Sequence, residues 1–76
     1  MEELVKTIAK SLVDKPDAVD VRTVEGDSEI TIELRVDPDD MGKVIGKQGR
    51  IAKAIRTVVK AVATREKKKV TVEIMQ

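Results

Sequence analysis

The stretch that decides the fold reads Val44-Ile45-Gly46-Lys47-Gln48-Gly49-Arg50-Ile51-Ala52-Lys53-Ala54-Ile55. Two glycines, Gly46 and Gly49, interrupt a pattern that is otherwise helical. Glycine ends helices readily, because it adopts a left-handed backbone conformation without a Cβ penalty. We therefore predict that one helix ends at Gly46, that the chain turns through Lys47 and Gln48, and that a second helix begins after Gly49.

This junction has the features of a phosphate-binding site. The second helix turns its unpaired backbone N–H groups and positive dipole end toward the loop, and such an end favours a phosphate. Lys47, Arg50 and Lys53 add positive charge, and Gln48 adds a neutral hydrogen-bonding group. The aliphatic residues beside the loop predict the floor of a narrow groove for bases: Val44, Ile45 and Ile51.

Other interpretations of the junction remain open. Two glycines near a helix–helix turn are also typical of a simple tight turn. The stretch from Gly42 to Lys47 resembles a P-loop, but it is one residue short and Gln48 replaces the Ser/Thr that binds magnesium. The loop follows a helix rather than a strand, which disfavours a dinucleotide site. A helix-hairpin-helix DNA binder typically has one residue between its glycines, whereas this loop has two.

Hydrophobic periodicity predicts the elements around this junction. The predicted helices cover residues 2–14, 38–45 and 50–64. The predicted strands cover residues 19–25, 29–36 and 70–75. Pro16 ends the first helix, and Asp37 is a good cap for the second, where Asp39 and Asp40 face the positive dipole end.

This order, α-β-β-α-α-β, predicts an α+β fold. The first two strands form an antiparallel hairpin, while two intervening helices allow the last strand to run parallel to the second. Each strand has one polar face, so the helices pack on one face of a three-stranded mixed sheet. A chain of 76 residues is the size of one small domain, residues 1–76.

The last helix has more apolar residues than one face needs. At 100° per residue one stripe forms the predicted core face: Ile51, Ile55, Val58 and Val62. Val59 and Ala63 lie off this stripe and are the predicted seam for a second protein.

Composition excludes several kinds of function. The chain has no cysteine and no histidine, so it lacks thiolate ligands and the usual general base at neutral pH. Asp37, Asp39 and Asp40 fit helix caps better than a metal site. It also has no aromatic residues, so bases cannot stack on rings. We expect neither an enzyme nor a cofactor, and the absence of signal-like or spanning segments predicts a cytoplasmic protein without a membrane partner.

Charge is strongly divided along the chain. Residues 1–42 have twelve acidic and five basic side chains, a net charge of −7, whereas residues 43–69 have ten basic and one acidic, a net charge of +9. A localised basic segment predicts a polyanion partner. The alternative is a charge-rich surface that serves solubility and stability.

The element order and the Gly46-Lys47-Gln48-Gly49 loop together resemble a type II KH domain over the whole chain. The I-G-x-x-G-x-x-I core is present as Ile45, Gly46, Gly49 and, one residue early, Ile51. The chain is most similar to the small single-KH bacterial proteins of the KhpA (YlqC) family.

This resemblance implies a protein that clamps about four nucleotides of single-stranded RNA or DNA against the loop. It implies RNA contacts by nine residues: Val44, Ile45, Gly46, Lys47, Gln48, Gly49, Arg50, Ile51 and Lys53. Ile55 would underpin the groove, and the second strand, around Ile32 and Leu34, would support its other side. The family implies an RNA-chaperone-like role linked to cell elongation and division, and self-association or pairing with a larger Jag-type KH protein.

The short acidic loop Glu25-Gly26-Asp27-Ser28 departs from what this resemblance needs. This loop would make few favourable contacts with a polyanion. We therefore expect weak nucleic-acid binding that tolerates many sequences and weakens with salt. The alternative function is a protein-interaction module whose RNA binding is weak or depends on a partner.

Overall fold

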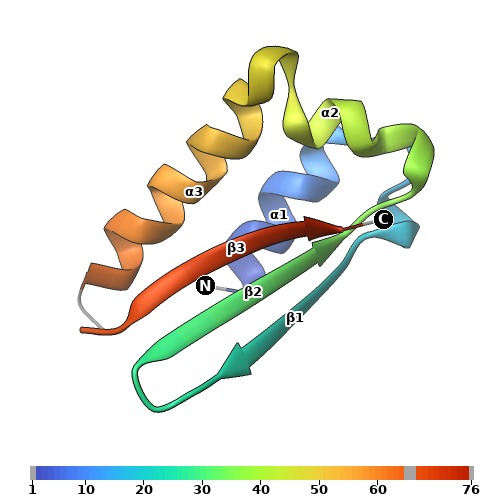
Figure 1. Ribbon diagram of the computed structural model, residues 1–76. Coiled ribbons are helices and arrows are strands. Elements are labelled where there is room, and N and C mark those ends of the chain that lie inside the picture. The colour runs from blue at the N-terminus through green and yellow to red at the C-terminus, as the bar shows by residue number, and fades with distance from the viewer. Residues whose placement is uncertain (1, 65–66, 76) are drawn as a thin grey trace.

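The computed structural model describes residues 2–64 and 67–75 (Figure 1). The helices are α1 (Glu2–Leu12), α2 (Met41–Ile45) and α3 (Arg50–Ala63), and the strands are β1 (Asp20–Glu25), β2 (Glu29–Arg35) and β3 (Lys69–Met75). Short 3₁₀ turns cover Pro16–Ala18, Pro38–Asp40 and Lys47–Gly49. The predicted order α-β-β-α-α-β and the α+β fold are confirmed. Within the described ranges, no helix has the length and apolar character needed to cross a membrane.

The sheet has the predicted mixed topology. Its strand order is β1-β2-β3, with β1 antiparallel to β2 and β2 parallel to β3. In this register Ile32 lies at the centre, opposite Thr23 on one side and beside Val72 on the other. The helices cover one face of the sheet, and β3 forms the edge nearest to α3 (Figure 1).

The core lies between the inward strand faces and the three helices. Alternation places every second residue of β2 in the core, and α1 adds Val5 and Ala9. The buried strand residues are Val21, Ile30, Ile32, Leu34, Val70 and Val72. Val24 lies on the opposite face of β1 and is 55% exposed, as its position in the alternation predicts.

The buried face of α3 differs from the predicted stripe. Ala52, Ile55, Val59 and Ala63 are buried, and they share one face of the helix. Val58 and Val62, predicted to face the core, are 43% and 47% exposed. Val59 and Ala63, the predicted seam, are 0% and 3% exposed, so that prediction is wrong. Both stripes have helical spacing and share Ile55; packing against the sheet and α1 selects a face rotated by roughly 75° from the predicted one.

A buried carboxylate joins the end of α1 to the start of α2. Asp40 is 2% exposed, and its two oxygens accept the backbone N–H groups of Asp14, at 3.3 Å, and Lys15, at 3.0 Å. Lys43 pairs with Asp14 and lies 3.7 Å from Asp40. Burial pushes the pKa of Asp40 upward, but the two N–H groups and the nearby Lys43 and Lys15 cations outweigh it and lower that pKa. The position of α2, and with it the loop that follows, is therefore fixed by polar contacts as well as packing.

Candidate nucleic-acid interface

Three of the four residues in the loop between α2 and α3 have a backbone conformation that side chains disfavour. Gly46 has φ 75°, Gln48 has φ 58° and Gly49 has φ 73°, all in the positive-φ region. The N–H of Gly46 donates to the Gly42 carbonyl at 2.9 Å, and the N–H of Gly49 donates to the Gly46 carbonyl at 3.2 Å. The predicted helix end, turn and second helix start are confirmed at these residues.

The two glycines serve different purposes. A Cβ on Gly46 would lie 2.6 Å from Cγ1 of Ile51, so this glycine lets the loop pack directly on the first turn of α3. A Cβ on Gly49 would meet nothing within 4 Å. A ligand can therefore approach Gly49 closely just where α3 begins, and α3 has no side-chain cap there. The N–H groups of Gly49 and Arg50 already donate to the carbonyls of Gly46 and Lys47, so the feature that suits an anion is the positive dipole end of α3.

The cations around this loop are available to a ligand. Lys47, Arg50 and Lys53 are exposed, as is Gln48. The ion pairs in residues 2–64 and 67–75 involve Lys15, Arg22 and Lys43, and none involves a basic residue between 47 and 60. Lys43 belongs to the basic half of the sequence, but its contacts with Asp14 and Asp40 make it part of the α1–α2 junction.

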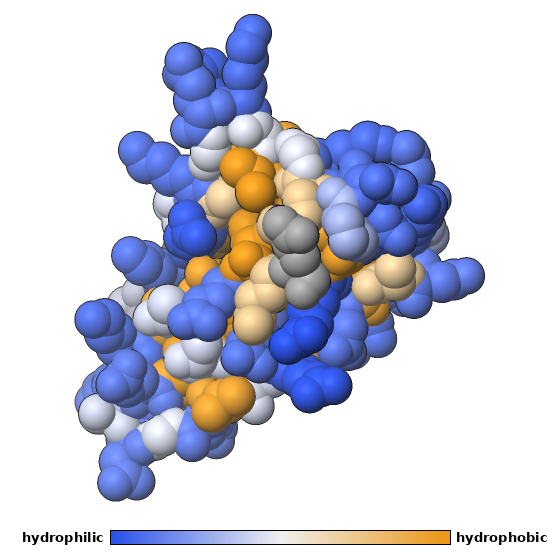
Figure 2. All heavy atoms as spheres, turned by 45° about the vertical axis from the view of Figure 1, so that its right-hand side comes forward, coloured by the Kyte–Doolittle hydropathy of each residue, from blue (hydrophilic) through white to orange (hydrophobic). Residues whose placement is uncertain are grey.

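The aliphatic residues predicted at the site are not equivalent. Val44 is 0% exposed and belongs to the core, so it supports the loop from below and does not reach a ligand. Ile45 is 36% exposed, and Ile51 is half-buried under Gly46. Figure 2 shows hydrophobic residues in a band on the face turned forward from the right of Figure 1, with hydrophilic residues on both sides. Beside the loop, Ile45 and part of Ile51 are thus accessible, whereas Val44 is not.

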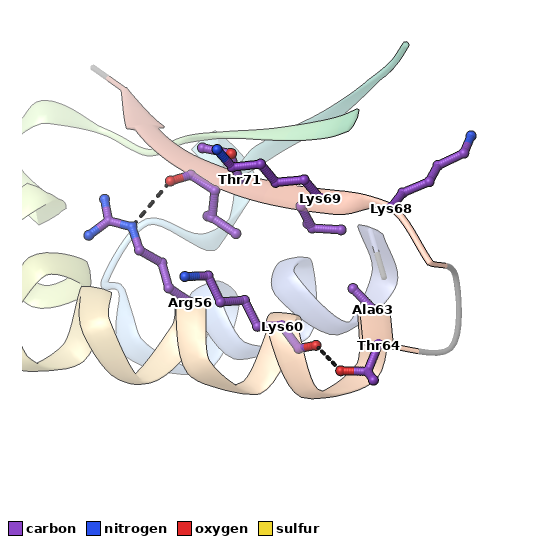
Figure 3. Close-up of a pocket in the computed structure, with 9 residues that line it drawn as sticks. Arg56, Lys60, Ala63, Thr64, Lys68, Lys69 and Thr71 are labelled. Atoms are coloured by element: carbon purple, nitrogen blue, oxygen red, sulfur yellow. Dashed lines mark hydrogen bonds between the residues drawn. The ribbon is translucent and has the colours of Figure 1, made fainter. Parts of the chain in front are cut away.

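The groove itself lies between α3 and β3, not against β2. A cavity of about 320 Å³ separates α3 from the edge strand (Figure 3). Its lining residues are Arg56, Lys60, Ala63, Thr64, Lys68, Lys69, Val70, Thr71 and Val72. Ile32 and Leu34, expected to support the groove from β2, are both 0% exposed in the core. They lie on the central strand, and β3 stands between that strand and the groove.

Four cations line this cavity: Arg56, Lys60, Lys68 and Lys69. None of them was among the site residues predicted from the sequence. The spacing of Lys53, Arg56 and Lys60 places them on one face of α3, so the sequence alone predicts a cationic face on this helix. That this face borders β3 depends on strand order and on the rotation of α3. The acidic loop 26–28 lies beside the start of β3, where Lys69 donates its N–H to the Ser28 carbonyl at 3.1 Å.

One side chain bridges the groove. Nε of Arg56 donates to the carbonyl of Val72 at 3.3 Å, across from α3 to the outer edge of β3 (Figure 3). No cluster of three or more His, Cys, Asp or Glu residues suited to a metal occurs in the part of the chain that the structure describes. The site thus combines a helix start without a side-chain cap, cations that form no ion pair among the described residues, and aliphatic surface, which suits a flexible polyanion.

Comparison with known proteins agrees with this arrangement. The family model for the KhpA/KhpB KH domain matches residues 2–74. This chain belongs to that KH-domain family. The family is non-enzymatic, in agreement with the expectation from composition. The RNA-binding protein KhpA of Caldanaerobacter subterraneus subsp. tengcongensis is 69% identical over 75 residues, 99% of this chain and 100% of that protein. The proteins of the same name from Clostridium perfringens and Listeria monocytogenes are 69% and 53% identical, and each is covered in full.

A solved structure extends the comparison to a larger protein. The fold is similar to part of Era, whose crystal structure contains MgGDPNP and nucleotides 1506–1542 of 16S ribosomal RNA. The TM-score is 0.63 at 25% sequence identity, and the match covers 96% of this chain and 28% of the Era chain. The similarity thus concerns only part of the Era chain.

Proposed function

We propose that this protein binds single-stranded RNA without catalysis, holding the sugar–phosphate backbone on the Gly46–Gly49 loop. The observation that carries the proposal is the unobstructed Gly49, where the start of α3, without a side-chain cap, meets the exposed Lys47, Arg50 and Lys53. A phosphate at this point would face the positive dipole end of α3 and three cations that make no ion pair with described residues.

From the loop, the strand would continue along the groove between α3 and β3. Ile45 and Ile51 offer aliphatic surface to the first bases, and Arg56 and Lys60 line the cavity further along α3. Lys68 and Lys69 add positive charge at its far end. This arrangement favours a flexible single strand, whose unstacked bases can reach a cavity between a helix and a strand.

RNA is the nucleic acid that the comparisons favour. The relatives carry the name RNA-binding protein, and the Era structure contains ribosomal RNA. Because the chain has no aromatic residues to stack bases, we expect binding in the micromolar range or weaker, with a broad tolerance of sequence. Weak, tolerant binding suits an RNA-chaperone-like role, and the family resemblance extends this proposal to the control of cell elongation and division.

A fluorescence-anisotropy titration tests this function. The ligand is a short mixed-sequence single-stranded RNA, and the proteins are the wild type and a Lys47→Asp/Gln48→Asp variant. Aspartate tolerates the positive φ of Gln48 better than most residues, so the loop should keep its conformation. We expect the variant to lose at least tenfold in affinity, because it places two carboxylates at the phosphate site.

The matched control is Thr7→Asp/Lys10→Asp, which makes the same change in net charge on exposed positions of α1. It should bind RNA within about twofold of the wild type, since screening weakens distant exposed charges. Equal loss in both variants would show that net charge, rather than the loop, carries the affinity. Normal binding by the loop variant would refute the assignment of the site.

A second function is favoured by the exposed face of α3. Val58 and Val62 are large apolar residues with 43% and 47% exposure, and Ala54 and Ala61 lie on the same side by spacing. This face is distinct from the cationic one that borders the groove. We propose it, in place of the predicted Val59 and Ala63, as the surface for a second copy or for a Jag-type KH protein.

Analytical ultracentrifugation at high concentration tests this second function. If α3 self-associates, Val58→Glu/Val62→Glu should shift the protein to the monomer, while Thr7→Glu/Lys10→Glu on α1 should not. If the wild type is monomeric at millimolar concentration, this face of α3 does not bind a second copy. Binding to a purified Jag-type KH protein would then be measured by mixing the two proteins. Absence of both associations would remove the proposal.

A further inference from the structure

Arg56 lies exposed on the wall of the groove and makes one hydrogen bond across it. Its Nε donates to the Val72 carbonyl on the outer edge of β3 at 3.3 Å. This contact joins the two sides of the cavity and uses one of the five N–H donors of the guanidinium. The carbonyl that it contacts belongs to β3, an edge strand of the sheet that the described residues form.

The remaining donors of Arg56 are presented to the groove. In Figure 3 the two terminal nitrogens point away from Val72 and along the groove, toward the N-terminal end of α3. This is the direction in which the Gly46–Gly49 loop lies. The guanidinium is planar, so fixing Nε also restricts the directions of the two terminal amino groups. A ligand base beside the loop therefore meets a fork of two parallel donors.

We propose that Arg56 is the base-reading residue of this protein, selecting bases that present two adjacent acceptors. This inference rests on the proposed RNA binding. Guanine offers O6 and N7, and cytosine offers O2 and N3. Adenine sets an amino donor next to N7, and uracil sets its N3–H between two carbonyls, so neither matches the fork in this way. The expected preference is for cytosine or guanine at one position of the bound strand.

The other cations of the groove are less suited to this task. Lys60, Lys68 and Lys69 carry compact charges on flexible stems, which suit phosphates in any orientation. None of them has a side-chain hydrogen bond among the described residues, whereas Arg56 has one to the backbone. Arg56 is thus suited to recognising a base, whereas the three lysines are suited to general electrostatic attraction.

The test is a set of anisotropy titrations with six-nucleotide RNAs. The reference is an all-uridine strand, and the others replace one central uridine with cytidine, guanosine or adenosine. Analogues that remove one acceptor, 7-deazaguanosine and 3-deazacytidine, show which base supplies the pair. The proteins are the wild type, Arg56→Lys, which keeps the charge but loses the planar fork, and Lys60→Gln as the control one turn along the same wall.

The wild type should bind a cytidine- or guanosine-containing strand about tenfold more tightly than the uridine and adenosine strands. Arg56→Lys should erase this difference while binding the uridine strand within about threefold of the wild type. Lys60→Gln should weaken all four strands by a similar factor. The analogue that loses the preference identifies cytosine or guanine as the base.

Equal affinity of the wild type for all four strands would overturn the inference but leave the proposed function intact. A preference that survives in Arg56→Lys would also overturn it, since the fork would then not be the reader. If the wild type binds no strand at high micromolar concentration, the proposed function fails as well, and this outcome differs from the other two.

Discussion

The α1–α2 junction and the α2–α3 loop use charge in opposite ways. At the junction, Asp40 is buried, accepts two backbone N–H groups and lies beside Lys43, which also pairs with Asp14. At the loop, Lys47 and Lys53 are exposed and make no ion pair with any described residue. Both regions lie at the ends of the five-residue helix α2.

This difference separates charges that hold the fold from charges that are left for a ligand. Disturbing a buried carboxylate that already accepts its hydrogen bonds costs stability. Its oxygens are not available to bind a ligand. Exposed cations beside an open helix start add little to stability and much to the attraction of a polyanion. Mutations in the two regions should therefore have different readouts, and four predictions test this from the largest effect to the smallest.

Gly46→Ala should cause the largest loss of stability. The backbone of Gly46 (φ 75°, ψ 175°) lies in a region almost restricted to glycine, which costs a residue with a side chain about 1–3 kcal/mol, and the new Cβ would clash with Ile51 at 2.6 Å, adding roughly 1–3 kcal/mol. Gly49→Ala shares the positive φ but meets open space, so it should cost about 1–2 kcal/mol. Urea unfolding followed by circular dichroism measures both; equal losses would contradict the different roles assigned to the two glycines.

Asp40→Asn should lower the melting temperature by roughly 5–10 °C at pH 7 and leave the loop cations unchanged. Because the folded-state pKa of Asp40 is lowered, its ionised form contributes stability above the usual 3.8, and that contribution is lost as the pH falls below it. The difference in melting temperature between wild type and variant should therefore shrink on acidification from pH 7 to below 3.8. A difference that stays constant over this range would show that the charge of Asp40 does not stabilise the junction.

Salt should weaken RNA binding far more than it weakens the fold. With about three phosphate contacts on a single strand, the log–log slope is about −2, so raising salt from about 50 to 200 mM should weaken binding by roughly 20-fold. The junction is short-range and partly buried, so the melting temperature should change by only about 1–2 °C. Anisotropy measures the RNA affinity and thermal melts measure the melting temperature in the same buffers. An RNA affinity that does not change with salt concentration would argue against a phosphate site.

Exchanging one lysine in each region gives the smallest and most selective effects. Lys53→Gln should weaken RNA binding by about three- to tenfold and reduce the salt slope by about 0.7, with an unchanged melting temperature. Lys43→Gln should lower the melting temperature by about 2–5 °C, because Asp14 and Asp40 lose their cation, and should leave RNA affinity within about twofold. If either variant shows the readout assigned to the other, the division between the two regions is wrong.

Much of this fold could be predicted because its signals are local. The alternation in β2 places Ile30, Ile32 and Leu34 inward whatever the neighbouring strands are, and the two glycines define the α2–α3 loop by their backbone alone. The hairpin and the parallel crossover follow from connection lengths. Asp37 caps the turn at Pro38–Asp40, as predicted, by accepting the N–H of Asp39 at 2.9 Å.

What could not be predicted depends on contacts distant in the sequence. The face of α3 that is buried was decided by packing, because two apolar stripes with the same spacing compete and share Ile55. The role of Asp40 requires the end of α1, more than twenty residues earlier, to reach it. The reach of Arg56 to β3 depends on which strand lies at the sheet edge, so the residues of the cavity wall could not be predicted from the sequence.

The most direct test of this account is a titration of ¹⁵N-labelled protein with short single-stranded RNA, followed by two-dimensional NMR. We expect the amide signals of residues 46–53 to shift most, with further shifts along β3 at the groove, while those of Asp14, Lys15 and Asp40 stay in place. Shifts centred on the α1–α2 junction, with the signals of Gly46 to Lys53 unchanged, would contradict the assignment of the open loop as the RNA site.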